Sequence, residues 1–487
     1  MWYQNAVCYE IYVPSFCDSN GDGIGDINGI RSKLPYLKKL GIKGIWLTPF
    51  YPSPRVDNGY DISNYKEVDP QFGTLEQLIS LFKEAHHLGI RVMIDMVINH
   101  TSNQHPWFLE SKKSKDNPYR DYYIWEPVVK NNWESFFAGS AWEYDETTNE
   151  YYYHAFAKEQ VCLNYSNPMV LQEVFDILRY WLKLGVDGFR FDVINFLKMK
   201  KNHWPDNPME GEKQIHRFDK NQEGILVLIE QIKRFCMKWP DKFLLGEIGE
   251  DKLEDMLPYV GTNRLDACFN FNIGSMEHFD LSKLWSELLA CERHGIVPTL
   301  FFSTHDMKRH ISRLCHGNRE MAKLLAFLLL TLKGIPFLYQ GEEQGVLDFC
   351  PKNIDEIQDI QGKLWYNNSV KQGKSPEQAF ELAYQNTRDF SRKLLAWSEM
   401  ENNDIITFYQ EIIAFRNEHK ALQFGEYEFL ELEDDILHYQ RRHGEEKMTM
   451  LLNFSSIEIP LCQEKNYVFT TQPEIKTLKP YQGVAYF

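Results

Sequence analysis

Three acidic residues that could share one active site stand at the ends of apolar stretches typical of buried strands. Asp192 follows 188–191, Glu247 ends 243–247 and Asp306 ends 301–306. Side chains alternate along a strand, so Arg190 points to the same side as Asp192, and a carboxylate beside a guanidinium stays ionised, as a nucleophile requires. Taken singly, each acid could be a strand-end cap or a surface charge. Three at matching strand ends favour one shared catalytic site.

Composition limits the class of protein and its partners. The chain has 487 residues, too many for one simple core, and its 53 basic against 69 acidic residues give a net charge of −16. This charge argues against nucleic acid or an anionic membrane as partner. The nine scattered cysteines lack C-x-x-C spacing and predict reduced thiols in the cytoplasm. We recognise no signal segment and no apolar run of about 18 residues, so no membrane span is expected. The sequence does not indicate an oligomeric state.

Short apolar stretches alternate with longer amphipathic ones, the pattern of a parallel α/β fold. Eight strands are predicted at 7–13, 44–47, 92–97, 188–192, 243–247, 267–271, 299–302 and 337–339. Eight such units favour a closed (β/α)8 barrel (TIM barrel), in which the acids fall at the C-terminal strand ends where active sites lie. A doubly wound open sheet is the alternative, but the Gly-rich turn expected after its first strand is missing.

Two stretches interrupt the alternation and predict further domains. Residues 100–168, after the third strand, are rich in Tyr, Trp, Asn and Ser and predict an inserted lid domain over the barrel mouth. Residues 404–487 begin with a helix at 405–418 and continue as alternating strands at 427–432, 436–442, 448–453 and near 484, which predicts a C-terminal β-sandwich. The barrel would then comprise 1–99 and 169–403.

Short motifs that contain the acids occur in a specific order along these strands. They are Asp95-x3-Asn99-His100, Gly188-Phe-Arg-x-Asp192, Gly246-Glu247 and His305-Asp306. Together they resemble the four motifs of the α-amylase superfamily of glycoside hydrolases, family thirteen. Three further segments resemble its oligo-1,6-glucosidase and trehalose-6-phosphate hydrolase branch: Asp57-Asn-Gly-Tyr60-Asp-Ile, Gly139-Ser-Ala-Trp142 and Arg388-Asp-x-x-Arg392.

The resemblance implies a retaining double displacement carried out by the three acids. Asp192 would be the nucleophile that forms a covalent glucosyl intermediate, Glu247 the general acid and then base, and Asp306 the residue that stabilises the distorted sugar. Retention implies that the Asp192 and Glu247 carboxyls lie about 5–5.5 Å apart. Glu247 must also stay protonated at neutral pH, which requires burial and nearby negative charge.

The resemblance also implies a pocket for one terminal glucose. Tyr60 would stack on the sugar ring, and Asp57 with Arg388 would close the pocket, which makes the enzyme exo-acting; an ordinary surface ion pair is the alternative reading of these two. Arg392 would face the leaving group. The substrate-binding set is Asp57, Tyr60, His100, Phe137, Arg190, His305, Arg388 and Arg392.

The loop 18–26 alternates carboxylates and amides with glycines, which suits a hard cation that prefers oxygen ligands. It lacks the glutamate at position twelve of an EF-hand loop, where Gly29 stands. It resembles the calcium loop of the oligo-1,6-glucosidase branch, which implies structural Ca²⁺, with Mg²⁺ as the alternative ion. A turn rich in Asx residues without metal would also explain the pattern. The implied ligands are Asp18, Asn20, Asp22, Ile24 and Asp26.

The chain departs from the family pattern near the pocket. Cys162 replaces an acid, Thr304 replaces an asparagine before the His-Asp pair, and residues 393–396 differ after Arg392. Val193 directly follows the expected nucleophile. In this branch, a valine at that position accompanies activity on α-1,6 linkages or on trehalose phosphate. These departures bear on leaving-group specificity more than on glucosyl chemistry.

The resulting hypothesis is an α-glucosidase that removes terminal glucose from a short oligosaccharide or disaccharide, of the isomaltose type or trehalose-6-phosphate. Phosphate recognition would need basic groups at the rim, where Lys198, Lys200 and Lys201 are either phosphate ligands or a solvated helix face. A trehalose synthase-like isomerase is the second reading. A non-catalytic family relative is the third, disfavoured because all three acids are present.

Overall fold

The central sheet consists of eight parallel strands, each within or overlapping a stretch that the sequence predicts as a strand. The computed structural model describes residues 1–487 except 202, 212, 251, 400–403, 462–464 and 474–475. The hydrogen-bonded order is β13-β12-β9-β3-β2-β1-β15-β14, which is the cyclic order of a (β/α)8 barrel. The strands are β1 (Cys8–Ile11), β2 (Gly44–Leu47), β3 (Arg91–Met96), β9 (Gly188–Phe191), β12 (Phe243–Gly246), β13 (Ala267–Cys268), β14 (Thr299–Leu300) and β15 (Ile335–Tyr339). The predicted barrel is confirmed.

A side chain joins β13 to β14, the two ends of this order. Thr299 Oγ1 donates to the Cys268 carbonyl at 3.0 Å and accepts from the Asn270 N–H at 3.0 Å. Asn270 also explains why β13 ends before the predicted residue 271. Its side chain accepts from the Ile273 N–H and starts the helix α8 (Phe271–Gly274), so the chain leaves the sheet early.

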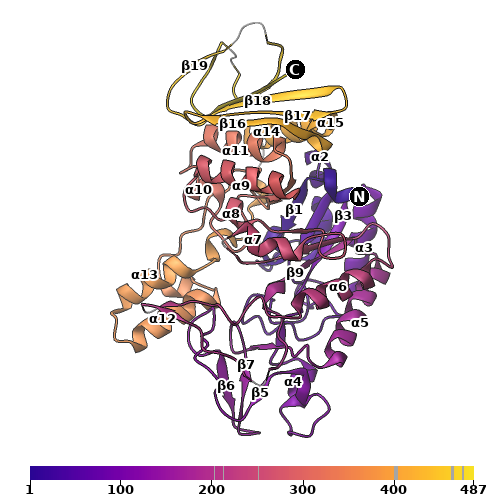
Figure 1. Ribbon diagram of the computed structural model, residues 1–487, viewed down its shortest axis with the longest axis vertical. Helices are drawn as coiled ribbons and strands as arrows, with labels where there is room; N and C mark the ends of the chain where they lie inside the picture. The colour runs from indigo at the N-terminus through magenta and orange to yellow at the C-terminus, as the bar shows by residue number, and fades with distance from the viewer. Residues whose placement is uncertain (202, 212, 251, 400–403, 462–464, 474–475) are drawn as a thin grey trace.

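Helices cover the outside of the strands (Figure 1). They include α2 (Ile27–Leu40), α3 (Leu75–His87), α5 (Pro168–Leu184), α6 (Ile225–Cys236), α9 (Leu281–His294) and α11 (Arg319–Thr331). Thr74 and Gln77 form a capping box that starts α3, and Gly185 ends α5 with a φ of 107° before the chain enters β9. In the part of the chain that the structure describes, no helix has the length and apolarity needed to cross a membrane.

The segment between β3 and α5 forms a small layer at the bottom of Figure 1. Its strand β4 (His100–Ser102) pairs with β8 (Gln160–Cys162), and β5 (Trp125–Glu126), β7 (Glu150–Tyr153) and β6 (Trp142–Asp145) form a second sheet near α4 (Pro106–Ser111). Trp204, from the loop after β9, stacks on the buried Trp133 with ring centroids 5.1 Å apart. The lid and the loop after the expected nucleophile therefore share one aromatic core.

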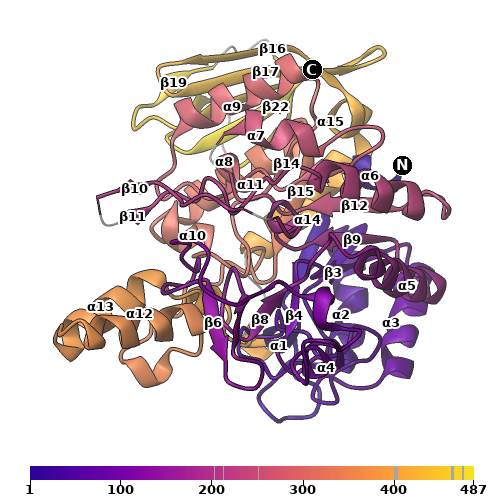
Figure 2. The ribbon, with the colours of Figure 1, turned by 60° about the horizontal axis from the view of Figure 1, so that its bottom comes forward.

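Two helices after β15, α12 (Ile360–Lys371) and α13 (Pro376–Asn386), form a hairpin that stands out to one side of the barrel (Figures 1 and 2). Ser375 and Gln378 form a capping box that starts α13. The hairpin lies between the last barrel strand and Arg388. Its base can therefore influence the site to which Arg388 belongs.

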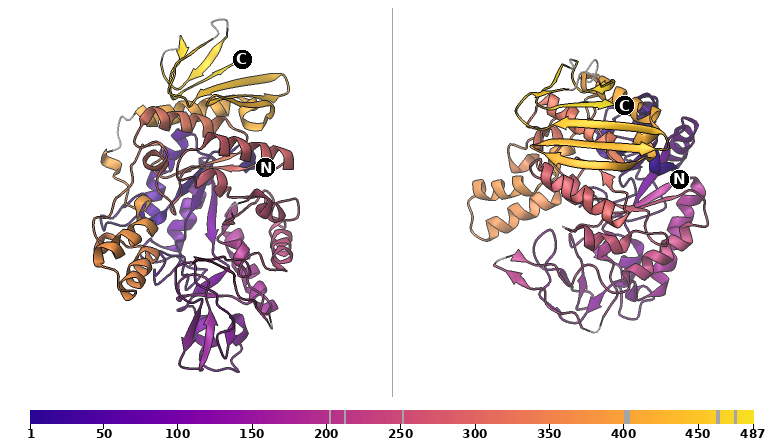
Figure 3. Two further views of the ribbon diagram at one scale, coloured as in Figure 1. Left: turned by 60° about the vertical axis from the view of Figure 1, so that its left-hand side comes forward. Right: turned by 45° about the horizontal axis from the view of Figure 1, so that its top comes forward.

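The C-terminal region is an antiparallel β-domain whose main sheet packs on helices α9 and α11 on the outside of the barrel (Figure 3). Its main sheet has the order β16 (Glu426–Glu433), β17 (Ile436–His443), β18 (Glu446–Asn453), β22 (Gln482–Tyr486), β20 (Tyr467–Thr470). The short pair β19 (Ile459–Pro460) and β21 (Thr477–Leu478) packs on it through a small cluster that includes Leu461, Leu478 and Val484. The predicted C-terminal β-domain is thus confirmed, with a second layer much smaller than the first.

Helix α14 (Asp404–Glu418) packs against α2 and α11, whereas the sequence groups it with the C-terminal strands. Buried Ile412 and Ile413 account for this contact. A Cβ on Gly41, which ends α2 with a φ of 95°, would lie 2.6 Å from Ile413 Cγ2. Close approach of α14 to the barrel therefore depends on a glycine at this position.

We expect Gly41→Ala to lower the thermal stability more than Gly295→Ala. Both glycines end 14-residue helices in the left-handed region, but nothing lies within 4 Å of a Cβ on Gly295. The extra overpacking against Ile413 should cost about 1–3 kcal/mol. Thermal unfolding of the two variants measures the difference, and equal losses would show that α14 does not constrain Gly41.

Candidate active site

The guanidinium of Arg190 joins carboxylates from three barrel strands. Its Nη1 lies 2.8 Å from Asp95 Oδ1 and 2.6 Å from Asp192 Oδ1, and its Nη2 lies 2.6 Å from Glu247 Oε2. Arg190 and Asp192 therefore point to the same side of the chain, as strand alternation predicts. The ends of β3, β9 and β12 meet at one cation, which brings together two of the three predicted acids.

Asp95 belongs to this centre, although the sequence analysis identified it only as part of a motif and not as a site residue. It is fully buried and also accepts from Trp46 Nε1 at 3.2 Å and from the Tyr60 hydroxyl at 3.0 Å. In the sheet register Asp95 lies directly beside Arg190. Register between strands 95 positions apart is not visible in the sequence, which is why this partner was missed.

Burial raises the pKa of both acids held by Arg190. The pKa of Asp192 rises to about 7, because burial and the charge of Asp95 outweigh the opposing effect of Arg190. The pKa of Glu247 rises to about 8 through burial, against Arg190, with further contributions from Asp192 and Asp306. The sequence-based expectation that the guanidinium alone keeps Asp192 ionised is thus too simple. The pKa of Glu247 is the higher of the two, so Glu247 keeps its proton to a higher pH than Asp192 does.

The third acid, Asp306, has the opposite electrostatic environment. Burial raises its pKa, but His305, Arg392 and Arg388 outweigh burial and hold the pKa well below its usual range. Arg392 Nη2 lies 2.6 Å from Asp306 Oδ1, and His305 Nε2 lies 3.2 Å from Asp306 Oδ2. Asp306 is therefore ionised at neutral pH.

Glu10 on β1 positions His305 and was also missed from the sequence. Its Oε1 lies 2.5 Å from His305 Nδ1 and accepts from the His305 backbone N–H at 3.1 Å. The ring of Tyr60 lies parallel to that of His305, and the Tyr60 hydroxyl is 2.7 Å from His305 Nε2. A charged residue inside the apolar run 6–13 was the available signal, because an isolated charge in a buried strand needs a partner.

Arg388 and Asp57 form the ion pair that the resemblance implies for the closed end of the pocket. Arg388 Nη2 lies 2.5 Å from Asp57 Oδ1, and Arg388 Nη1 lies 3.5 Å from Asp306 Oδ1. Asp57 is 3% exposed, so this is not a surface ion pair. The ring of Phe137 lies 5.1 Å from the guanidinium carbon of Arg388 and packs along this wall.

Arg392 binds the segment that carries the third acid, and its expected place toward the leaving group stays a prediction. Its Nε donates to the His305 carbonyl at 2.7 Å, and its buried guanidinium binds Asp306. It therefore holds the third acid in place. His100 Nε2 lies 3.1 Å from the Tyr60 carbonyl, and Gln160 Nε2 lies 3.1 Å from His100 Nε2.

Val193 follows the nucleophile candidate in a backbone conformation that β-branched residues rarely adopt. Its φ is 38° and its ψ is 46°, in the left-handed region. In this conformation its N–H donates to Glu247 Oε2 at 3.1 Å. The strained turn after Asp192 thus supplies a second donor to the carboxyl of Glu247, beside Arg190.

Two of the three departures from the family pattern, Thr304 and Cys162, are accommodated without loss of the site. Thr304 Oγ1 accepts from the Asp306 N–H at 3.2 Å and so stabilises the loop that carries the third acid. Cys162 is fully buried in the lid core, where burial raises its thiol pKa to about 11 and Asn99 Nδ2 lies 3.7 Å from its sulfur. Both residues act on the scaffold behind the pocket.

The basic residues considered for phosphate recognition are used elsewhere. Lys198 is 1% exposed and donates to the carbonyls of Phe196 and Asp219, so it is neither a rim cation nor part of a solvated helix face. Lys200 donates to the Trp125 carbonyl at 2.9 Å. Lys201 is half-buried. The first two lysines therefore connect the loop after β9 to its own backbone and to the lid.

The predicted metal loop is held by its own backbone donors. Asp18 accepts from the N–H groups of Gly21 at 2.7 Å and Gly23 at 2.8 Å, and Asp22 accepts from Ile24. The Asp26 carboxylate accepts from the Gly29 N–H and caps α2, and its role as a metal ligand stays a prediction. Within the described ranges no three Asp, Glu, His or Cys side chains gather as ligands. The remaining oxygens of the loop are chemically suited to Ca²⁺, which stays a prediction.

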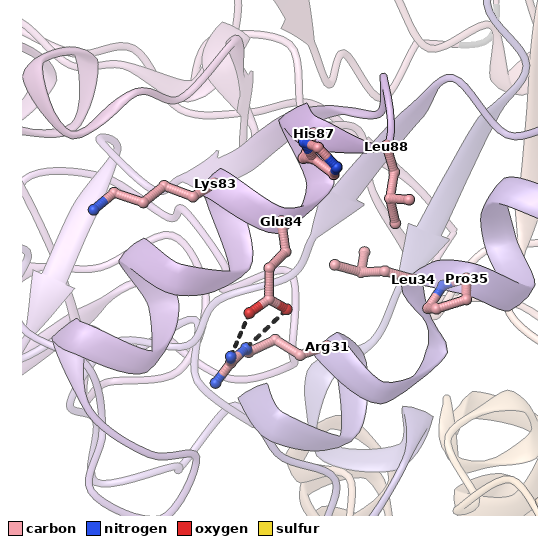
Figure 4. Close-up of a pocket in the computed structure, with 7 residues that line it drawn as sticks. All are labelled: Arg31, Leu34, Pro35, Lys83, Glu84, His87 and Leu88. Carbon is pink, nitrogen blue, oxygen red and sulfur yellow. Dashed lines mark hydrogen bonds and ion pairs between the residues drawn. The ribbon is translucent and has the colours of Figure 1, made fainter.

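A groove of about 330 Å³ lies on the outside of the barrel between α2 and α3 (Figure 4). Its one carboxylate, Glu84, is paired with Arg31, as the dashed lines show. The other lining residues are Leu34, Pro35, Lys83, His87 and Leu88. The groove contains none of the predicted catalytic acids and plays no part in the site.

Comparisons with known proteins agree with this arrangement. The model of the alpha amylase catalytic domain matches residues 10–425. An oligo-1,6-glucosidase of Parageobacillus thermoglucosidasius is 38% identical over 518 residues, covering 93% of this chain and 91% of that protein. A trehalose-6-phosphate hydrolase of Bacillus subtilis (strain 168) is 32% identical over 553 residues, covering 100% and 98%.

A solved structure with the same architecture comes from a third activity. A mutant isomaltulose synthase of Erwinia rhapontici NX5, solved in complex with its natural substrate sucrose, has a TM-score of 0.91 and 32% identity. The match covers 100% of this chain and 99% of that chain. Proteins with this fold and similar sequence thus act on different disaccharides, so the linkage has to be argued from the rim of the site.

If the loop 18–26 binds Ca²⁺, adding the ion after treatment with a chelator should raise the melting temperature by several degrees. Neutralisation of repulsion between Asp18 and Asp22 is the physical reason. Thermal unfolding measures the shift, and Asp22→Ala should remove it. An identical melting temperature with chelator and with Ca²⁺ would show that the backbone donors alone hold the loop.

Proposed function

The chain belongs to the α-amylase family of glycoside hydrolases, and we propose that it is a retaining, exo-acting α-glucosidase. Its substrate is a short oligosaccharide or disaccharide with a terminal α-linked glucose. The observation that carries the proposal is the guanidinium of Arg190, which binds Asp192 and Glu247 at 2.6 Å each. A shared cation places nucleophile and acid on one reacting centre.

In the first step the Asp192 carboxylate attacks the anomeric carbon while Glu247 gives its proton to the leaving oxygen. Asp306 stays ionised and hydrogen-bonds the hydroxyls of the distorted sugar. Formation of the glucosyl ester removes the negative charge of Asp192, which lowers the pKa of Glu247. Glu247 then accepts a proton from water, and the hydroxide released in this way cleaves the ester.

The Asp57–Arg388 pair supports exo action. It lies beside Asp306, and both partners are buried or nearly so, with side chains 5% and 14% exposed. Two charged side chains in fixed geometry offer donors and acceptors to the hydroxyls of one terminal glucose. They leave no path for a chain to continue beyond it.

Within this class we infer an isomaltose-type substrate without phosphate. Lys198 is buried and donates to backbone carbonyls, which removes one of the three candidate phosphate ligands, and the exposed Lys200 already donates to the Trp125 carbonyl. Val193 after the nucleophile is compatible with α-1,6 linkages.

An isomerase that rearranges a disaccharide is the second candidate, favoured by the similarity to isomaltulose synthase. It would use the same acids but would transfer glucose to the retained acceptor in place of water.

We also infer a reducing, cytoplasmic location, because the described cysteines are unpaired thiols and all but Cys350 are buried.

The pH profile of kcat/KM should be bell-shaped, with limbs near pH 7 and pH 8. Below about pH 7 Asp192 gains a proton and loses its nucleophilicity, whereas above about pH 8 Glu247 loses the proton that the leaving group needs. Hydrolysis of 4-nitrophenyl α-glucoside measures the profile. Full activity from pH 5 to pH 7 would contradict it, since Arg190 would then outweigh burial at Asp192.

Isomaltose should release glucose, and trehalose-6-phosphate should not. The test is glucose release from isomaltose, maltose, sucrose, trehalose and trehalose-6-phosphate at equal concentration. Asp192→Asn is the control: it should lose at least about 10³-fold in activity and keep its fold, because the covalent step is lost.

Glucose from trehalose-6-phosphate alone would contradict the neutral-substrate proposal. Rearranged disaccharide with little free glucose would instead establish the isomerase.

A further inference from the structure

The side chain of Asp359 is turned away from the helix that it begins. An aspartate at the first position of a helix ordinarily accepts a hydrogen bond from the first turn, as Asp280 does for α9. Asp359 makes no such bond to α12, although its side chain is fully buried. Its carboxylate must therefore be satisfied by another partner.

That partner is Arg388, 29 residues further along the chain. Arg388 Nε lies 3.1 Å and 3.2 Å from the two oxygens of Asp359, and Nη2 also donates to Oδ1. The backbone N–H of Arg388 donates to Asp359 Oδ2 at 2.9 Å. The carboxylate thus fixes both the main chain and the guanidinium of Arg388. Bidentate contacts of this kind are directional and strong.

Asp389, the residue after Arg388, makes the reverse contact with the segment that contains Asp359. The carboxylate of Asp389 accepts from the backbone N–H groups of Gln358 at 2.8 Å and Asp359 at 3.1 Å. Each segment therefore supplies a carboxylate to the backbone of the other. The base of the α12–α13 hairpin and the Arg388 segment are consequently held as one unit.

The position of Arg388 decides what it can offer to a sugar. Asp359 occupies its Nε edge, while Nη2 also reaches Asp57 and Nη1 is directed toward Asp306 at 3.5 Å. A free arginine has many rotamers, and ordering it on binding would reduce affinity. Burial raises the pKa of Asp359, but Arg388 and Arg392 outweigh burial and lower it, so the carboxylate stays charged.

We propose that Asp359 is a positioning residue that sets the closed end of the glucose pocket by holding Arg388 in place. Through it, the placement of the α12–α13 hairpin governs how tightly the terminal glucose is held. The inference rests on the proposed function, since it requires Arg388 to contact that glucose. Asp359 itself touches no reacting atom.

Asp359→Asn should raise KM for isomaltose about tenfold and lower kcat much less, because Arg388 binds the terminal glucose in ground state and transition state alike. A double-mutant cycle with Arg388→Ala provides the decisive measurement. If Asp359 acts only through Arg388, the double variant should match Arg388→Ala in kcat/KM. Additive losses, or an unchanged KM in Asp359→Asn, would overturn the proposal.

Two further variants separate this effect from a loss of stability. Asp280→Asn, at a helix start remote from the site residues described above, should lower the melting temperature slightly and leave KM unchanged. If Asp359→Asn does not fold, Asp359→Glu keeps the charge but adds a methylene that displaces Arg388. It should also raise KM, and a wild-type KM in that variant would overturn the proposal.

Glucose binding distinguishes failure of this inference from failure of the proposed function. The rise in melting temperature with added glucose measures binding without turnover. If the wild type releases no glucose from any substrate but binds glucose more tightly than Asp359→Asn, only the proposed function fails. If the wild type is an active glucosidase and the two proteins bind glucose equally, only this inference fails.

Discussion

One buried cation, the guanidinium of Arg190, is the constraint on which the rest of the site depends. It is 2% exposed and is bound by carboxylates from β3, β9 and β12. Buried charges persist only when they are paired and hydrogen-bonded, so these three strand ends must stay in register for the protein to fold. The ion pairs of Arg190 therefore both hold the catalytic acids in place and stabilise the barrel.

The pKa values of Glu247 and Asp306 shift in opposite directions because the neighbours of the two acids differ. Glu247 faces other carboxylates and a shared guanidinium, so burial prevails and its pKa rises, whereas Asp306 lies beside Arg388 and Arg392 and its pKa falls. One acid is left protonated and another ionised at neutral pH. The pocket lies between two cationic centres, Arg190 on the strand side and the Arg388–Arg392 pair on the rim, with Tyr60 and His305 beside them.

The elements around this site were predictable to different degrees. The strands were found because parallel strands are apolar on both faces and end in polar residues, and β2 matches its predicted bounds. The start of α8 at Phe271 and the packing of α14 on the barrel were not found. The first depends on a local cap by Asn270, and the second on a close approach between Gly41 and Ile413 that no periodicity records.

The barrel, the order of the motifs and the three strand-end acids can be read from the amino-acid sequence, because each acid follows an apolar strand that can be recognised locally. Which charges meet is visible only in the folded chain. Asp95, Glu10 and Asp359 are 0–2% exposed and bind Arg190, His305 and Arg388 across separations of 29 to 295 residues. Such pairing depends on strand register and loop packing. Both are set by interactions throughout the fold and not by the local sequence. The three acids could therefore be identified from the sequence, whereas the neighbouring charges that set their pKa values could not.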